Sequence, residues 1–245
     1  MIEVCGTSVC GPRRRNNEDS FDYRYEDGIL VMAVADGLGG MPYGEIASGI
    51  AVSSAMDFIM GSIDNDMSDE DLEFLLDRAF NKANVDILRN CVDEPDHIGM
   101  SSTLTVGVIR HGRLTLSHFG DCRCYIVRDG KIEQLTDDHN LAGYLVRSGE
   151  ITEEESMSDP GRSSLLNCLG ENTFIRPDIN GYDVISGDCV ILATDGMYSL
   201  FEKDAFRDIL EHADSPKTLC ELLEIRGTTD DSRDNSTVVA AYITE

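Results

Sequence analysis

The sequence predicts an α+β fold in which antiparallel sheets are covered by pairs of helices. Segments with a helical spacing of apolar residues come in adjacent pairs, and the strand-like runs between them follow one another as hairpins. Such an order of elements is typical of layered α+β domains. The 245 residues include 41% hydrophobic residues and no linker, repeat or low-complexity segment. We therefore expect one domain over residues 1–245.

The first part of the chain combines strands with two long helices. Residues 2–11 alternate loosely and end in a Gly-Pro turn, and residues 21–35 contain a strand pair. Residues 44–60 repeat apolar side chains at a spacing of three and four, which predicts a helix. Ser68 precedes three acidic residues, a composition that favours the start of a second helix.

The middle of the chain is rich in strands. Residues 102–109 and 114–119 are two strand-like runs separated by a turn. Residues 122–127 form another run, which leads into Asp129-Gly130. Because Asp-Gly is favoured in tight turns, we expect a further hairpin there.

The last part of the chain returns to helices. A short helix is expected at residues 141–148, followed by a polar, irregular stretch over residues 149–176. Within this stretch we expect a mobile flap at about residues 149–170. Then follow a strand, helices over residues 203–213 and 216–226, a polar loop and a final strand.

The charge balance limits the classes of partner. A formal net charge of −26 argues against binding to nucleic acid or to an anionic membrane surface. No apolar run approaches about 18 residues and no N-terminal signal is present. We therefore expect a cytoplasmic protein. The eight cysteines contain no Cys-x-x-Cys pair and often lie in apolar runs, so we interpret them as reduced thiols.

Three aspartates lie where strand-like runs begin or end. Asp36 and Asp195 each follow an apolar run and precede a glycine, and Asp234 directly precedes the final run. A single Asp-Gly is most often only a turn. Three such carboxylates, each beside a rigid strand, would instead form a cluster of hard oxygen ligands if these strand ends meet. Such ligands suit Mg²⁺ or Mn²⁺.

A charged loop precedes the strand pair. Arg13-Arg14-Arg15 is followed closely by Glu18-Asp19. This loop is either a solvated charge run or a place where acids extend a metal site while an arginine binds a phosphate. No motif for a nucleophilic serine or cysteine and no Walker-type loop is present, so neither a covalent mechanism nor that type of nucleotide hydrolysis is favoured.

Several blocks of residues together resemble the metal-dependent Ser/Thr protein phosphatases of the protein phosphatase 2C type, in their compact bacterial form. The resemblance covers nearly the whole chain, and the blocks occur in the order of the family. They are residues 14–20, 36–40 with 44–48, 101–104, 120–123, 135–140, 194–196 and 234–237. The fold implied by this resemblance is a central sandwich of two antiparallel sheets flanked by helix pairs, in α-β-β-α layers.

The resemblance also implies a centre with two Mn²⁺ or Mg²⁺ ions. Asp36 would bridge the two ions, and Gly37 would offer its backbone carbonyl to one of them. Asp195 and Asp234 would complete the other site. Asp121 would bind the third ion found in bacterial members of the family.

Other residues of this implied site act less directly. Glu18 and Asp19 would contact the metals mainly through water, and Arg14 would hold the phosphoryl oxygens. Leu38 stands where eukaryotic members carry a histidine proposed as the general acid. A metal-bound water would then protonate the leaving oxygen.

The function implied by the resemblance is hydrolysis of phosphoserine and phosphothreonine by a hydroxide that bridges the two metals. The expected partners are phosphorylated proteins and a cognate Ser/Thr kinase, and we expect a monomer. Two alternatives remain at this point. The chain could be a catalytically weak, phosphatase-like binding or sensor module, or it could be a phosphatase of small phosphomonoesters.

Overall fold

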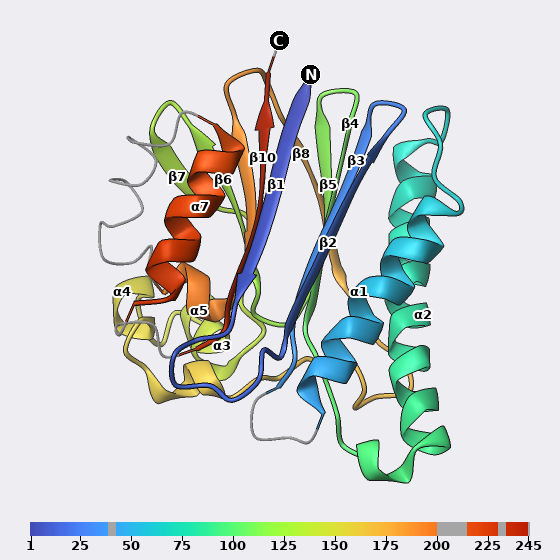
Figure 1. Cartoon of the computed structure of the whole chain (residues 1–245), viewed down its shortest axis with the longest axis vertical. Coiled ribbons are helices and arrows are strands. Elements are labelled where there is room, and N and C mark those ends of the chain that lie inside the picture. Colours follow the sequence, from blue (N-terminus) through green and yellow to red (C-terminus); the bar gives the residue numbers. More distant parts are fainter. Residues whose placement is uncertain (39–42, 200–214, 230–233, 245) are drawn as a thin grey trace.

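Two antiparallel five-stranded sheets form the centre of the computed structural model, which describes residues 1–38, 43–199, 215–229 and 234–244 (Figure 1). The first sheet contains, in spatial order, β1 (Ile2–Val9), β10 (Ser236–Ile243), β9 (Cys189–Ala193), β6 (Arg123–Arg128) and β7 (Lys131–Gln134). The second sheet contains β2 (Asp19–Glu26), β3 (Ile29–Asp36), β4 (Leu104–Arg110), β5 (Arg113–Phe119) and β8 (Asp178–Asp183).

Helices cover the outer faces of both sheets. The pair α1 (Gly44–Met60) and α2 (Asp69–Asp93) lies on the second sheet, and α5 (Asp195–Tyr198) and α7 (Pro216–Gly227) lie on the first (Figure 1). The remaining helices are η1 (Pro95–His97), α3 (Leu141–Arg147), α4 (Glu153–Ser156) and η2 (Pro160–Ser163). This arrangement confirms the predicted α+β sandwich.

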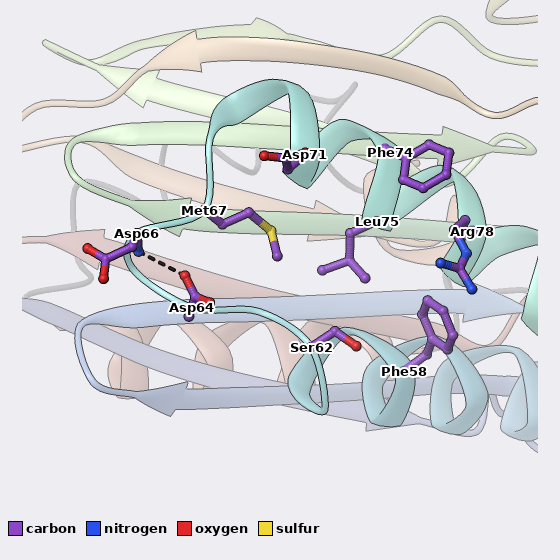
Figure 2. A pocket seen from close by; sticks show the side chains of 9 residues that line it. All are labelled: Phe58, Ser62, Asp64, Asp66, Met67, Asp71, Phe74, Leu75 and Arg78. Atoms are coloured by element: carbon purple, nitrogen blue, oxygen red, sulfur yellow. Dashed lines mark hydrogen bonds between the residues drawn. The ribbon is translucent and has the colours of Figure 1, made fainter.

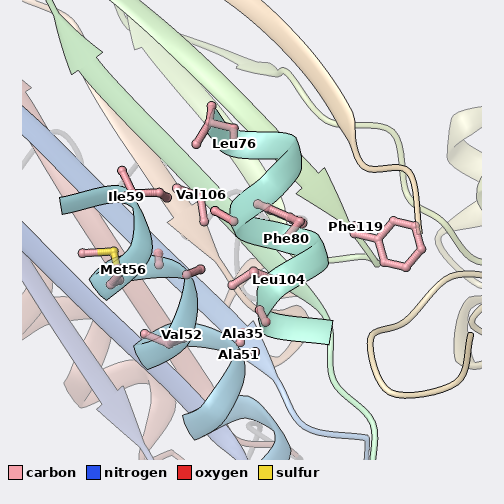
Figure 3. Close-up of a cluster of buried hydrophobic side chains, with 14 of the residues drawn as sticks. Ala35, Ala51, Val52, Met56, Ile59, Leu76, Phe80, Leu104, Val106 and Phe119 are labelled. Atoms are coloured by element: carbon pink, nitrogen blue, oxygen red, sulfur yellow. The ribbon is translucent and has the colours of Figure 1, made fainter. Parts of the chain in front are cut away.

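Three apolar clusters hold the layers together. Met32 of one sheet and Leu192 of the other belong to the cluster between the sheets. Met56 of α1 and Phe80 of α2 are buried against the second sheet (Figure 3). Leu223 of α7 packs on the outer face of the first sheet. Because helices cover the outer face of each sheet, central strands such as β3 and β9 are buried on both faces and read as continuous apolar runs.

The structure follows the predicted elements closely, with a few differences. Helix α1 has the predicted bounds, and the side chain of Ser68 caps α2 by accepting from the backbone N–H of Asp71 at 3.1 Å. Asp129 and Gly130 both have positive φ values, 52° and 71°, as a two-residue hairpin turn requires. The predicted helix over residues 203–213 lies outside the described residues.

The stretch expected to be irregular, residues 149–176, contains two short helices, α4 and η2, and is tied to the rest of the fold. Leu165 pairs with Asn140, and Leu169 pairs with Ser102. Strand β8 follows this stretch and was not predicted. Its sequence is largely polar, and its residues are exposed or half-buried because β8 is an edge strand that, among the described strands, pairs only with β5.

All eight cysteines are free thiols, and five of them are buried. No helix in the described ranges is long and apolar enough to cross a membrane.

A buried histidine in β5 gives a first testable consequence. His118 lies between the hydroxyl of Thr105, 2.8 Å from its Nδ1, and the carbonyl of Asp137, 3.1 Å from its Nε2. The carbonyl can only accept, so Nε2 carries the proton and Nδ1 accepts. Burial, together with the neighbouring His139, lowers the pKa of His118 to about 3.

We expect acid to destabilise the protein through His118. A histidine with a lowered folded pKa contributes stability above its unfolded pKa of about 6.5 and loses it as the pH falls toward 3. Compared with His118→Gln, the wild type should therefore lose about 2 kcal/mol of unfolding free energy between pH 7.5 and pH 5. Denaturant titrations at both pH values measure this difference. His111→Asn, in an exposed turn, is the control, and an equal pH response of wild type and His118→Gln would contradict the assignment.

Candidate metal and phosphate site

Four chain segments bring their acidic residues to one end of the sandwich. Asp19 begins β2 and lies opposite Asp36, the last residue of β3. In the other sheet, Asp195 lies two residues after the end of β9, at the start of α5, and Asp234 lies two residues before the start of β10. Figure 1 places these strand ends together, at the end of the sandwich away from both termini. The hypothesis that the three aspartates meet is therefore supported by the topology.

Asp36 is fixed by backbone hydrogen bonds. Its N–H donates to the hydroxyl of Thr103 at 2.8 Å, and its carbonyl accepts from the N–H of Thr103 at 2.9 Å and from the hydroxyl of Ser102 at 3.0 Å. These bonds extend the β3–β4 pairing to the last residue of the strand. The carboxylate thus projects from a rigid base.

Gly37 lies in a space that only glycine can occupy. Its N–H donates to the carbonyl of Glu18 at 2.9 Å. A Cβ at this position would lie 2.1 Å from the carbonyl oxygen of Gly44, at the start of α1. The close packing of these backbones holds the Gly37 carbonyl beside Asp36.

Asp19 is buried and held by two threonines that the sequence analysis did not identify. Its Oδ2 accepts from the hydroxyl of Thr194 at 2.8 Å and from the hydroxyl of Thr237 at 2.7 Å. The N–H of Thr237 in turn donates to the Thr194 hydroxyl at 3.0 Å. Thr194 precedes Asp195, and Thr237 follows Asp234 by three residues. The sequence signal that could have identified both threonines is therefore their place in the blocks 194–196 and 234–237.

Arg14 lies among the carboxylates. Its Nη2 donates to Oδ2 of Asp234 at 2.6 Å, and its Nη1 is 3.6 Å from Oε2 of Glu18. Gly196, next to Asp195, packs closely on the segment that carries Asp234. A Cβ at Gly196 would lie 3.0 Å from the Cβ of Asp234. The predicted phosphate-binding arginine is therefore at the site, where it neutralises part of the acidic charge.

Asp121 reaches the same region from the segment between β5 and β6. It is buried, and the amide of Asn140 donates to its Oδ2 at 3.3 Å. Two residues on, Arg123 binds both carboxylate oxygens of Asp138 at 2.8 Å and stacks on the ring of Tyr198 at 3.9 Å. The sequence analysis assigned no role to these supporting residues, although Arg123 lies in the same block as Asp121, and Asp138 and Asn140 lie in the block over residues 135–140.

The carboxylates repel one another. The pKa of Asp19 and of Asp121 is raised to about 7, and that of Asp195 to about 6. Burial is the largest cause of these raised pKa values, and repulsion by neighbouring aspartates adds to it. The pKa of Asp36 is also raised well above its ordinary value, first by burial and then by Asp19. Positive charge placed among these groups would therefore stabilise their ionised forms.

The donor chemistry fits hard divalent cations. Among the described residues, no three acidic, histidine or cysteine side chains form a complete metal site by themselves. Mg²⁺, however, usually keeps several waters and takes only one or two carboxylates. The side chains of Asp36, Asp195 and Asp234, with the Gly37 carbonyl, supply oxygen donors of this kind, whereas zinc prefers nitrogen and sulfur. We conclude that the site fits the predicted cations.

All eight predicted site residues thus lie at one end of the fold. They are Arg14, Glu18, Asp19, Asp36, Gly37, Asp121, Asp195 and Asp234. Their individual roles stay predictions. Residues 39–42, which follow Leu38 in the glycine-rich loop, lie outside the described residues.

Comparison with known proteins identifies relatives of the whole chain. A sequence model of the family described as "Protein phosphatase 2C" matches residues 10–224. The chain is 34% identical over 248 residues to the serine/threonine protein phosphatase PstP of Mycobacterium tuberculosis, covering 100% of this chain and 46% of PstP. It is thus about half as long as that relative. It is 30% identical to the protein phosphatase PhpP of Streptococcus pneumoniae, covering 100% of this chain and 98% of PhpP.

A solved structure has a similar fold over the whole chain. The catalytic domain of PstP, in complex with two manganese ions, superimposes with a TM-score of 0.80 at 31% identity and covers 100% of this chain and 99% of that domain.

Proposed function

Because the chain belongs to the protein phosphatase 2C family, we propose that it is a metal-dependent phosphatase that hydrolyses phosphoserine and phosphothreonine in proteins. The observation that carries this proposal is the group of buried and half-buried carboxylates from four segments, with Arg14 among them. Such a site combines oxygen ligands for cations with a donor for a bound anion. A phosphate ester and two divalent ions have the matching chemistry.

We assign the residues the following roles. Asp36, the Gly37 carbonyl, Asp195 and Asp234 would hold two Mn²⁺ or Mg²⁺ ions, and Asp121 would hold a third. When bound, two such ions supply an activated water and neutralise charge on the phosphoryl oxygens. Glu18 and Asp19 would act through water.

Arg14 has a separate role in this proposal. The planar guanidinium has N–H donors on all three nitrogens, so it can bind a phosphoryl oxygen while it still contacts Asp234. Asp234 thereby positions the arginine at the edge of the metal site. The guanidinium and the cations would then both neutralise the negative charge of the phosphate.

The function is tested by comparing substrates. Phosphate release should be measured from a phosphothreonine peptide, a phosphotyrosine peptide and p-nitrophenyl phosphate, each with Mn²⁺. A protein phosphatase gains transition-state binding from peptide contacts, so kcat/KM should be highest on the phosphothreonine peptide. A higher value on p-nitrophenyl phosphate than on any peptide would favour a phosphatase of small phosphomonoesters. Absence of turnover on all three would overturn the proposal.

Arg14 provides a sharper prediction. Arg14→Ala should raise KM for the phosphothreonine peptide by about tenfold or more, because a charge-assisted hydrogen bond to the phosphate is lost. Arg14→Lys should restore only part of the binding, since an ammonium cannot contact the phosphate and Asp234 with a planar fork. Arg15→Ala is the matched control, because Arg15 is exposed in the same loop. If Arg14→Ala and Arg15→Ala change KM equally, Arg14 does not bind the phosphate.

We further propose that the substrates are products of a Ser/Thr kinase and that the enzyme acts as a monomer. Sedimentation velocity over a range of concentrations would test the second point.

A further inference from the structure

A groove lies at the far end of the α1–α2 helix pair, away from the acidic site. Its volume is about 570 Å³, and its walls are the C-terminal turns of α1 and the N-terminal turns of α2 (Figure 2). The loop between the two helices closes one end. Helix α1 begins beside Gly37, so roughly 20 Å of helix separates Phe58 in the groove from the metal site.

The floor of the groove is apolar. Phe58, Met67 and Leu75 line it and pack against the core cluster under the helices. Phe74 also lines the groove, and 62% of its surface is exposed. A large apolar side chain that is this exposed at the mouth of a groove can bury area against a ligand without unfolding anything.

The rim of the groove is acidic. Asp64, Asp66 and Asp71 line it and are exposed, and in the described part of the chain none of the three forms an ion pair with a lysine or arginine. Arg78 is the cation among the lining residues, and its guanidinium lies over the rings of Phe58 and Phe74, at 5.4 Å and 5.7 Å. The lining thus carries a net negative charge around an apolar centre.

The groove is preformed. The side chain of Asn65 donates to the carbonyl of Asp27, and Arg110 donates to the carbonyl of Asp64 at 3.3 Å. These contacts tie the loop between the helices to the ends of two neighbouring hairpins. A ligand would therefore meet a surface whose shape is already set, which reduces the entropy cost of binding.

We propose that this groove docks a basic peptide segment with one large apolar side chain. The apolar anchor would lie on Phe74, Leu75 and Met67, while lysine or arginine residues on either side would face the aspartates of the rim. Charge complementarity selects this occupant. Asp64 and Asp71 accept hydrogen bonds from the Asp66 N–H and the Ser68 hydroxyl, but none of the three carboxylates has a cationic partner in the described part of the chain. They would therefore repel an acidic segment and would lose hydration without compensation under a neutral one. The docking surface is independent of the catalytic site and provides a second point of contact for a protein partner.

The test uses two fluorescein-labelled peptides, Lys-Arg-Phe-Lys-Arg and Lys-Arg-Ala-Lys-Arg, titrated with the full chain by fluorescence anisotropy. The Phe peptide should bind at least tenfold more tightly than the Ala peptide. Phe74→Ala should weaken the Phe peptide at least tenfold, and Asp66→Asn should weaken both peptides, less so in high salt. Val92→Ala and Glu73→Gln are the matched controls, because both residues are exposed on α2 outside the groove.

Three results would overturn the proposal. These are equal affinity of the two peptides, equal effects of Phe74→Ala and Val92→Ala, and equal effects of Asp66→Asn and Glu73→Gln. Sedimentation of the free protein adds a fourth. If the chain forms dimers that Phe74→Ala abolishes, the occupant of the groove is a second copy of the chain and not a basic peptide. Turnover of p-nitrophenyl phosphate should be the same in all four variants.

Discussion

Asp36→Asn should lower kcat for a phosphothreonine peptide by a factor of about 10³ or more. The side chains are nearly equal in size, so the change removes charge while it keeps shape. Asp36 is expected to contact both cations, and an amide oxygen is a much weaker ligand for a hard cation than a carboxylate. The affinity for Mn²⁺, measured by calorimetry, should fall together with kcat.

The same substitution should not destabilise the metal-free protein. Burial and the neighbouring aspartates raise the pKa of Asp36, so an uncharged side chain relieves repulsion at this place. In chelator, the melting temperature of Asp36→Asn should therefore equal or exceed that of the wild type. Asp22→Asn, in the middle of β2, is the control and should leave kcat unchanged. Full activity of Asp36→Asn with a normal Mn²⁺ affinity would contradict the assignment.

Gly37→Ala is the second change with a large expected effect. The added Cβ would lie 2.1 Å from the carbonyl oxygen of Gly44 and 2.7 Å from that of Glu18. Backbone atoms at these distances have to move, and overpacking of this kind costs about 1–3 kcal/mol. The movement would also displace the Gly37 carbonyl and Glu18, so activity should fall by about tenfold or more even where the protein is fully folded.

Gly49→Ala is the matched control for this prediction. Gly49 lies within α1, and a Cβ there would meet only the hydroxyl oxygen of Ser20, at 3.9 Å. Alanine in a helix is favoured over glycine by about 1 kcal/mol, so this variant should be more stable and equally active. Denaturant titrations and phosphate-release assays of both variants make the comparison. If Gly37→Ala is as stable and as active as Gly49→Ala, the close packing at Gly37 has no role in the site.

The sequence allowed much of the fold to be predicted because the relevant signals are local. An apolar run that stops at Asp36-Gly37 marks the end of a strand, and the spacing in residues 44–60 marks a helix. The same local reading located Asp195 and Asp234. The local pattern did not predict strand β8, since its polar residues form a strand only through pairing with β5.

The contacts that complete the site are not local. Thr194 and Thr237 bind Asp19 across 175 and 218 residues of sequence, and Arg14 binds Asp234 across 220. The family resemblance assigned a phosphate to Arg14, but the sequence could not show that Asp234, a predicted metal ligand, holds this arginine. Likewise, the groove beside Phe74 combines two helices and a loop, so no single periodic pattern indicates it.

We propose that the acidic end of the sandwich is a metal centre that hydrolyses phosphothreonine. The most direct test of this proposal is phosphate release from a phosphothreonine peptide while free Mn²⁺ or Mg²⁺ is set by a chelator buffer. We predict no release in excess chelator and a rate that rises to saturation with either or both cations. Undiminished release from protein that metal analysis shows to be free of divalent cations would contradict this proposal, as would no release with both cations at saturating peptide.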